Sequence, residues 1–214
     1  MADPTLRLTY TQLRIRVAEY LGVADYSGGT AGLPTDPHDL DMVGRLVNDG
    51  YRRFLSDHPR WNFLTVPLTL TFGTGTVGGD ASRYYLPDDF GGKLLAPFTY
   101  GTGGPSLEVR QVPEATIRRY RQGDGSGTGQ PAAFAVRPIN TTNAATGQRW
   151  EAVFWPTPAG TQTVTALYRR SPNALSAAGD TSVAGHEHDT AVLGACIAAA
   201  ELEKNDTIGV REQR

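Results

Sequence analysis

The sequence predicts an α+β protein in which a helical bundle of two N-terminal helices and one C-terminal helix carries an inserted antiparallel β domain, sandwich-like or barrel-like. Near both ends of the chain, apolar residues recur at three- and four-residue steps, which is typical of helices. Between residues 61 and 170, short runs rich in Thr, Val and aromatic residues alternate with Gly-rich turns, which is typical of strands. We therefore expect the bundle from residues 1–60 and 176–214 and the β domain from residues 61–175.

The first helix is expected over residues 9–21. Thr9 and Gln12 have the spacing of a capping box, in which each side chain accepts a hydrogen bond from the other residue's backbone N–H. Gly22 is expected to end the helix, because glycine tolerates the backbone conformation found just after a helix. The apolar residues that recur at helical spacing are Tyr10, Leu13, Val17 and Leu21.

Two further helices share this periodicity. One begins near Asp39 and stops at His58 and Pro59, with apolar positions at Leu40, Val43, Val47, Tyr51, Phe54 and Leu55. The other is C-terminal, and one of its sides carries Val192, Cys196, Ala199 and Glu203. Its small side chains predict close approach to another helix, so we expect the N-terminal and C-terminal helices to pack together.

The β domain is predicted from six short runs, at residues 63–72, 82–87, 105–112, 132–139, 149–156 and 161–170. The last run alternates plainly, since Thr161, Thr163 and Thr165 would face one way and Val164, Ala166 and Tyr168 the other. One helix is expected to interrupt the strands at residues 113–121, with Pro113 in its first position and Ile117 and Tyr120 on its apolar edge.

Composition limits the possible functions. The 214 residues carry a formal net charge of -2, and basic residues do not cluster, so neither a phosphate backbone nor an anionic membrane is indicated as a binding partner. A single cysteine, Cys196, rules out an intrachain disulfide and a cysteine-built zinc site. The N-terminus has no apolar core of signal-peptide length, and we expect synthesis in the cytoplasm.

Two clusters of residues could be taken for chemical sites. His186 and His188 are two residues apart, whereas zinc-binding helices place histidines four apart, and the neighbouring acids suit a helix start better than a metal. Asp88 and Asp89 are adjacent, and adjacent side chains that leave a strand point apart instead of facing each other across a cleft. The sequence therefore predicts no catalytic, metal or cofactor site, no cofactor and no enzyme.

Aromatic residues leave one alternative open. Trp150 and Trp155 could line a sugar-binding face, which would make the chain a β-rich binding module, either glycan-binding or capsid-decorating. Five positions apart on a strand, however, the two side chains point to opposite sides, so at least one is expected in the core.

Several segments, taken in order, resemble the head-to-tail adaptor, or connector, proteins of tailed bacteriophages. The resemblance is carried by "LVNDGYRRFLSDHPRWNFL", "YYLPDDF", "GQPAAFAVRP", "EAVFWPTP", "ALYRRSPNAL" and "HDTAVLGACIAAAELEKND", at residues 46–64, 84–90, 129–138, 151–158, 166–175 and 188–206. These segments cover most of the chain from about residue 40 onward.

The resemblance implies a virion structural protein at the head-tail junction. Such a protein assembles as a ring, commonly of twelve copies, beneath the portal protein and above a downstream tail, nozzle or stopper protein. The ring continues the DNA channel, so double-stranded DNA would pass through it without specific binding, and no membrane is involved. By the same resemblance, the C-terminal residues that would contact the portal are Ile208, Gly209, Val210, Arg211, Glu212, Gln213 and Arg214.

Overall fold

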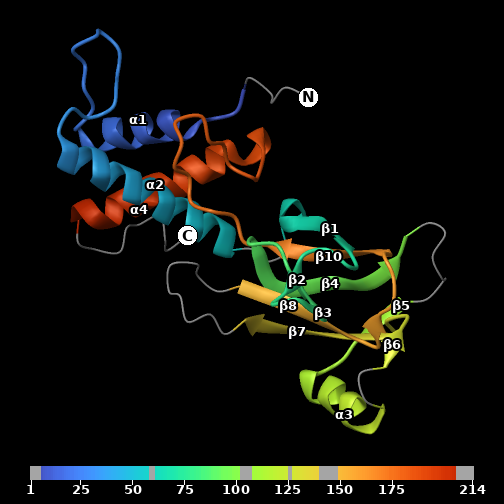
Figure 1. Ribbon diagram of the computed structural model, residues 1–214. Coiled ribbons are helices and arrows are strands. Elements are labelled where there is room, and N and C mark those ends of the chain that lie inside the picture. The colour runs from blue at the N-terminus through green and yellow to red at the C-terminus, as the bar shows by residue number, and fades with distance from the viewer. Residues whose placement is uncertain (1–5, 58–60, 102–107, 125–126, 140–148, 206–214) are drawn as a thin grey trace. The chain divides into compact units, whose positions relative to one another are not determined.

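The computed structural model describes residues 6–57, 61–101, 108–124, 127–139 and 149–205. The chain divides into two compact units (Figure 1). Met1–Phe63 and Pro172–Arg214 form what we call the helical unit, and Leu64–Ser171 form the β unit. Across the described ranges, no helix combines the length and the apolar character needed to cross a membrane.

The helical unit contains α1 (Tyr10–Leu21), α2 (Pro37–Asp57) and α4 (Asp189–Asn205). The capping box at the start of α1 is confirmed, because the Thr9 side chain accepts from the Gln12 N–H and the Gln12 side chain accepts from the Thr9 N–H. Gly22 ends α1 as predicted, with a φ of 77° in the left-handed region.

One apolar core joins the three helices. α2 packs against α4, and α1 contacts both. The predicted inner side of α4 is buried at Val192, Cys196 and Ala199. Glu203 was expected on that side but is exposed, because burying an unpaired carboxylate is costly.

The two long helices touch backbone to backbone at one point. A Cβ placed on Gly50 of α2 would lie 2.3 Å from the Cα of Cys196 in α4, so no side chain fits between the helices there. This contact is the close approach that the small side chains of α4 predicted.

The β unit is built on one eight-stranded sheet with the strand order β1-β10-β4-β5-β7-β8-β3-β2. Its strands are β1 (Thr65–Thr71), β2 (Thr76–Val77), β3 (Asp80–Tyr85), β4 (Phe90–Tyr100), β5 (Glu108–Gln111), β7 (Ala133–Ile139), β8 (Arg149–Trp155) and β10 (Thr163–Arg170). A separate parallel pair consists of β6 (Thr128–Gly129) and β9 (Thr157–Pro158). The edge strands β1 and β2 are joined by only four residues, 72–75, so the sheet must curl until its two edges come close.

The sheet differs from the predicted antiparallel domain. It is mixed, because β5 and β7 pair in parallel through the crossover helix α3 (Glu114–Asp124). Parallel neighbours need such a crossover, since a tight turn can join only antiparallel strands. The predicted sandwich is not confirmed, because the long strands all belong to one curled sheet.

The longest strand, β4, was missed. Its sequence "FGGKLLAPFTY" contains Gly91, Gly92 and Pro97, which are typical of turns and weaken a strand pattern. Pairing with β10 and β5 on its two sides nevertheless holds it in the sheet. The alternation predicted for residues 163–168 of β10 is confirmed, since its threonines are exposed and Val164, Ala166 and Tyr168 are buried.

Strands β7 and β8 separate two apolar layers. On one side, Phe134 and Phe154 join the large aromatic core of the curled sheet. On the other side, Ala135 and Val153 lie against Ile117 of α3. Helix α3 begins at Glu114, one residue later than predicted, and extends past the predicted end to Asp124.

Candidate functional site

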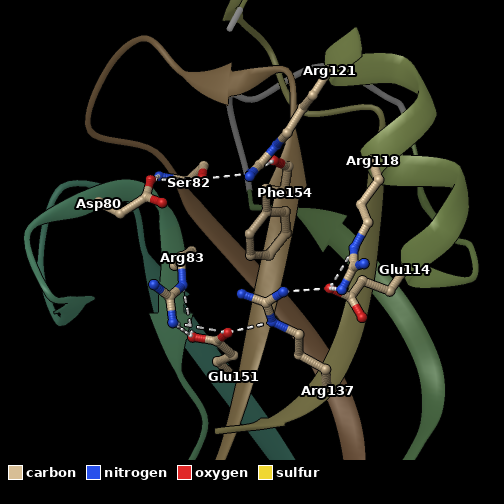
Figure 2. A network of polar contacts seen from close by, with 9 residues as sticks. All are labelled: Asp80, Ser82, Arg83, Glu114, Arg118, Arg121, Arg137, Glu151 and Phe154. Atoms are coloured by element: carbon tan, nitrogen blue, oxygen red, sulfur yellow. Dashed lines mark hydrogen bonds and ion pairs between the residues drawn. The ribbon is translucent and has the colours of Figure 1, made fainter. Parts of the chain in front are cut away.

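A polar network fastens α3 to the sheet, and Glu151 of β8 is its centre (Figure 2). Only 1% of the Glu151 side chain is exposed. Arg83 of β3 donates to both carboxylate oxygens, from Nε at 3.0 Å and from Nη2 at 3.1 Å. Arg137 of β7 donates from Nε to Oε1 of the same carboxylate. A buried carboxylate needs such partners, because an uncompensated charge in the interior is costly.

The network continues from the sheet to the helix through Glu114. Arg137 donates from Nη1 to Glu114, and Arg118 donates to the same carboxylate at 2.9 Å. The hydrogen bonds from Arg118 and Arg137 lower the pKa of Glu114 below its ordinary value of 4.5. Burial by itself would lower the pKa of Arg137, but its bonds to Glu151 and Glu114 outweigh burial and raise it. Arg137 therefore remains a cation that links a strand carboxylate to a helix carboxylate.

A second connection reaches the other end of α3. Arg121 donates to the hydroxyl of Ser82 at 2.6 Å and to the backbone oxygen of Phe154 at 3.5 Å. Ser82 in turn donates to Asp80 at 2.7 Å. Burial raises the pKa of Asp80, but the bonds from Ser82 and the nearby arginine charges bring it below its ordinary value.

We call this network the α3 clamp. Its members are Asp80, Ser82, Arg83, Glu114, Arg118, Arg121, Arg137 and Glu151. Between its two polar connections, Ile117 is 1% exposed, and Tyr120 packs on Trp155 with ring centroids 4.7 Å apart. Arginines bond Glu114 and Glu151, and Ser82 bonds Asp80, so these carboxylates serve to position α3. The clamp holds α3 in place while the outer residues Ala115, Arg119 and Gln122 stay exposed.

The sequence prediction missed the clamp, although a signal existed. Arg137 is the one charge of β7, Glu151 is the one acid of β8, and the strand register places them directly opposite each other. Opposite charges at facing positions stabilise a strand pair. The pair could have been proposed from the sequence, but its connection to Glu114 depends on where α3 lies.

His186 and His188 open a helix, as predicted, in the short 3-10 turn His186–His188 before α4. The His188 ring packs among three aromatic rings, with centroid distances of 6.1 Å to Phe54, 5.2 Å to Trp61 and 5.5 Å to Phe63. In the part of the chain that the structure describes, no three His, Cys, Asp or Glu residues are grouped to hold a metal ion.

Asp88 and Asp89 point to different partners. Asp88 pairs with Arg149, whereas Asp89 accepts from the Tyr168 hydroxyl at 2.7 Å. Burial, followed by the bond to Asp89, raises the pKa of Tyr168 to about 12. The two carboxylates therefore do not form an acid-base pair.

The two tryptophans of β8 lie on opposite faces of the strand. Trp150 packs on Phe90 of the aromatic core, with ring centroids 5.9 Å apart, and Trp155 packs under α3 against Tyr120. Since both rings are partly buried in these separate layers, they do not make one sugar-binding row.

Cys196 is fully buried, as its apolar neighbours predicted. Its Sγ donates to the Val47 backbone oxygen at 3.4 Å, and burial raises the pKa of the thiol to about 12. Residues 208–214, predicted to contact a portal, lie outside the described residues.

Comparison with known families assigns the chain. A search among curated proteins found no match. A family model described as SU10 adaptor protein matches residues 8–214, which is nearly the whole chain. The match spans both units and includes the α3 clamp. The chain thus belongs to the SU10 adaptor family, a family of phage head-to-tail adaptor proteins, which makes it a structural component of a bacteriophage virion.

Proposed function

We propose that the protein forms a closed ring, with twelve copies as the expected number, that joins the portal protein to the tail and continues the DNA channel. The observation that carries this proposal is the family match over residues 8–214. A ring requires two different surfaces on each subunit, so that the contact repeated by rotation closes on itself.

The two units are expected to bind different partners in the ring assembly. We propose that they act as separate domains, since each has its own apolar core. The helical unit would bind the portal, with residues 208–214 as the contacting segment. The β unit would face a downstream tail, nozzle or stopper protein, with α3 as a rigid docking element.

The chain's charge fits passive passage of double-stranded DNA. A formal net charge of -2 leaves a closed ring without the excess of cations that binding to phosphates requires. The DNA would then move through the channel without being held by the adaptor.

Electron cryo-microscopy of the full-length chain mixed with its phage's portal protein tests the proposal. The expected result is a ring of this chain coaxial with the portal, with an open central channel. Portal particles that lack any extra ring density, at adaptor concentrations well above those of the portal, would contradict it.

The portal contact needs its own variant. Deletion of residues 208–214 is expected to abolish co-purification with the portal while leaving the thermal unfolding of the chain unchanged. A matched control carries the same deletion replaced by seven glycine and serine residues, which keeps chain length but removes the side chains. Portal binding by both variants at the full-length level would refute this assignment.

A further inference from the structure

A groove lies between α1 and α2 of the helical unit. It has a volume of about 570 Å³, and pockets that bind ligands usually have about 300–1,000 Å³. Its charged lining consists of Arg14, Asp41, Arg45, Asp49 and Arg52. Asp41 pairs with Arg45, and Asp49 pairs with Arg52. The groove therefore has one positive charge in excess, and Arg14 supplies it.

Arg14 of α1 is positioned to bind an anionic group. Its guanidinium lies over the Tyr10 ring, 4.7 Å from the ring centroid, which restricts its orientation. Its Nε is buried and bonds no acceptor, and no acid of the described residues forms an ion pair with it. A partly buried cation without a counter-charge is costly. A carboxylate brought by another molecule would therefore stabilise this arginine.

The same unit has an acidic segment. Residues 17–44 contain no lysine or arginine but five acids, Glu19, Asp25, Asp36, Asp39 and Asp41. Within this segment, the loop 22–36 joins α1 to α2 and extends away from both helices (Figure 1). We call residues 25–32 of this loop the tip loop. A subunit with an acidic projection and a basic groove has two different surfaces that attract each other, as a ring contact requires.

The tip loop is held in a defined conformation. Asp25 donates to the Gly32 oxygen at 3.3 Å, and Gly32 donates to the Asp25 oxygen at 2.7 Å. Ser27 donates to the Asp25 carboxylate from its N–H and from its hydroxyl, both at 2.9 Å. Tyr26 is 59% exposed, more than any other aromatic side chain of the described residues. A preorganised loop loses little conformational freedom on binding, and tyrosine is a common anchor of protein interfaces.

We propose that the tip loop of one copy binds in the groove between α1 and α2 of a second copy. The Tyr26 ring enters the groove, and the Asp25 carboxylate accepts from Arg14. An ionised carboxylate has about four acceptor sites, so Asp25 can bond an arginine and keep both bonds from Ser27. The proposal rests on the proposed ring, in which each subunit offers one tip loop and one groove.

The charges of the groove and the exposure of the tip loop favour this occupant. One excess positive charge matches one carboxylate, whereas Asp41 and Asp49 in the lining would repel the many charges of a phosphate backbone. Residues 26–30 of the tip loop are all exposed and take no part in the apolar core of their own unit. They are therefore free to contact a second copy.

One pair of variants tests the charge of the groove. Arg14→Gln removes the cation. Arg16→Gln makes the same change on the same helix, at a side chain that is 63% exposed and pairs with Glu19. The adaptor concentration needed for half-maximal ring formation on the portal is expected to rise about tenfold in Arg14→Gln, the effect of one lost hydrogen bond to a charged group. It is expected to stay unchanged in Arg16→Gln.

Thermal unfolding of the monomers separates assembly from folding. Because Arg14 has no acid partner among the described residues of its own chain, Arg14→Gln is expected to leave the melting temperature of the monomer unlowered. Equal concentrations for half-maximal ring formation in Arg14→Gln and Arg16→Gln overturn the proposal.

Photocrosslinking identifies what the tip loop contacts. The photoreactive amino acid p-benzoylphenylalanine replaces Tyr26, and equal amounts of isotope-labelled and unlabelled chains are mixed and assembled on the portal. The expected product in mass spectrometry joins the tip loop of one copy to a peptide from residues 37–52 of another. A crosslink to a portal or tail peptide instead, to a different part of a second copy, or none between copies overturns the proposal.

These outcomes separate the inference from the proposed function. Rings that form on the portal without this crosslink leave the adaptor function standing and reject the tip-loop contact. Crosslinking is also carried out on the chain alone at high concentration. A chain that never joins a portal but still crosslinks from tip loop to groove between copies retains the contact and rejects the adaptor ring.

Discussion

The helical unit and the β unit bury their interiors in different ways. In the helical unit, α2 and α4 meet through small residues, and the closest point is Gly50 against Cys196. In the β unit, α3 and the sheet meet through the apolar layer around Ile117 and also through a charged network, in which Glu151 is almost fully buried. Adding a methyl group at Gly50 would force α2 and α4 apart. Removing the Glu151 carboxylate would instead leave Arg83 and Arg137 without their shared partner.

Polar groups also have different tasks in the two units. In the helical unit they fasten loops to helices. Asn48 of α2 both donates to and accepts from the backbone of Leu175, and Asp189 accepts from the Leu8 N–H at 2.6 Å. In the β unit they hold one element of secondary structure, α3, against another. The comparison predicts that substitutions of charged residues will be most harmful in the β unit.

The largest effect is expected from Glu151→Ala. The substitution leaves Arg83 and Arg137 facing each other with no carboxylate between them, and breaking a buried ion pair in this way costs about 3 kcal/mol or more. Urea denaturation followed by tryptophan fluorescence measures the loss. Arg118→Ala is the control, because its side chain is 71% exposed and its ion pair is worth about 0.5 kcal/mol. Similar losses for the two variants would contradict the proposed importance of Glu151.

Gly50→Ala tests the helical unit. The new methyl group would meet the α4 backbone at 2.3 Å, so the helices must separate, which we expect to lower the free energy of unfolding by about 2 kcal/mol. Thermal denaturation measures the change.

Gly194→Ala is the matched control for Gly50→Ala. Gly194 lies in α4, and its added Cβ would meet nothing within 4 Å. Because alanine favours a helix over glycine, this variant is expected to gain up to about 1 kcal/mol. The same sign for both glycine variants would show that the close approach of α2 and α4 does not limit stability.

Removal of the N-cap by Thr9→Ala is expected to have a smaller effect. The Gln12 N–H then loses its acceptor at the start of α1, which typically costs about 1 kcal/mol. Hydrogen exchange of the first-turn amides of α1 measures it locally. Gln12→Ala removes only the reciprocal half of the capping box, so its effect on those amides should be weaker than that of Thr9→Ala.

The smallest expected effect is on the stability of the fold at acidic pH, and it comes from Glu114. Because its arginine partners lower the pKa of Glu114 in the folded protein, this carboxylate stabilises the fold at pH values above its unfolded pKa of about 4.5. The contribution is lost as the pH falls below 4.5 and through the folded pKa. Melting temperatures recorded from pH 7 down to pH 3 should therefore fall less steeply in Glu114→Gln than in the wild type.

A matched variant, Glu108→Gln, places the same substitution on an exposed side chain of β5. Its acid profile is expected to follow that of the wild type. Parallel curves for all three proteins would show that the clamp makes no acid-dependent contribution.

Local patterns determined much of the secondary structure. The ends of α1 follow from Thr9, Gln12 and Gly22, whose effects operate within one helical turn. The alternation of β10 and the position of α2 also follow from the spacing of apolar residues. The family resemblance, drawn from segments along the chain, is confirmed by the family match.

The tertiary structure alone decided the remaining features. Strand β4 contains residues typical of turns and is held by pairing with β10 and β5, which are distant in the sequence. The parallel pairing of β5 with β7 depends on the path of α3, and the α3 clamp joins residues up to 68 positions apart. Propensity and periodicity act over a few neighbouring residues, whereas strand partners and the burial of a charge depend on contacts between distant parts of the chain. For that reason local patterns were enough to predict the helices and six of the strands, whereas the order of the strands and the meeting of charges in the α3 clamp depend on the fold.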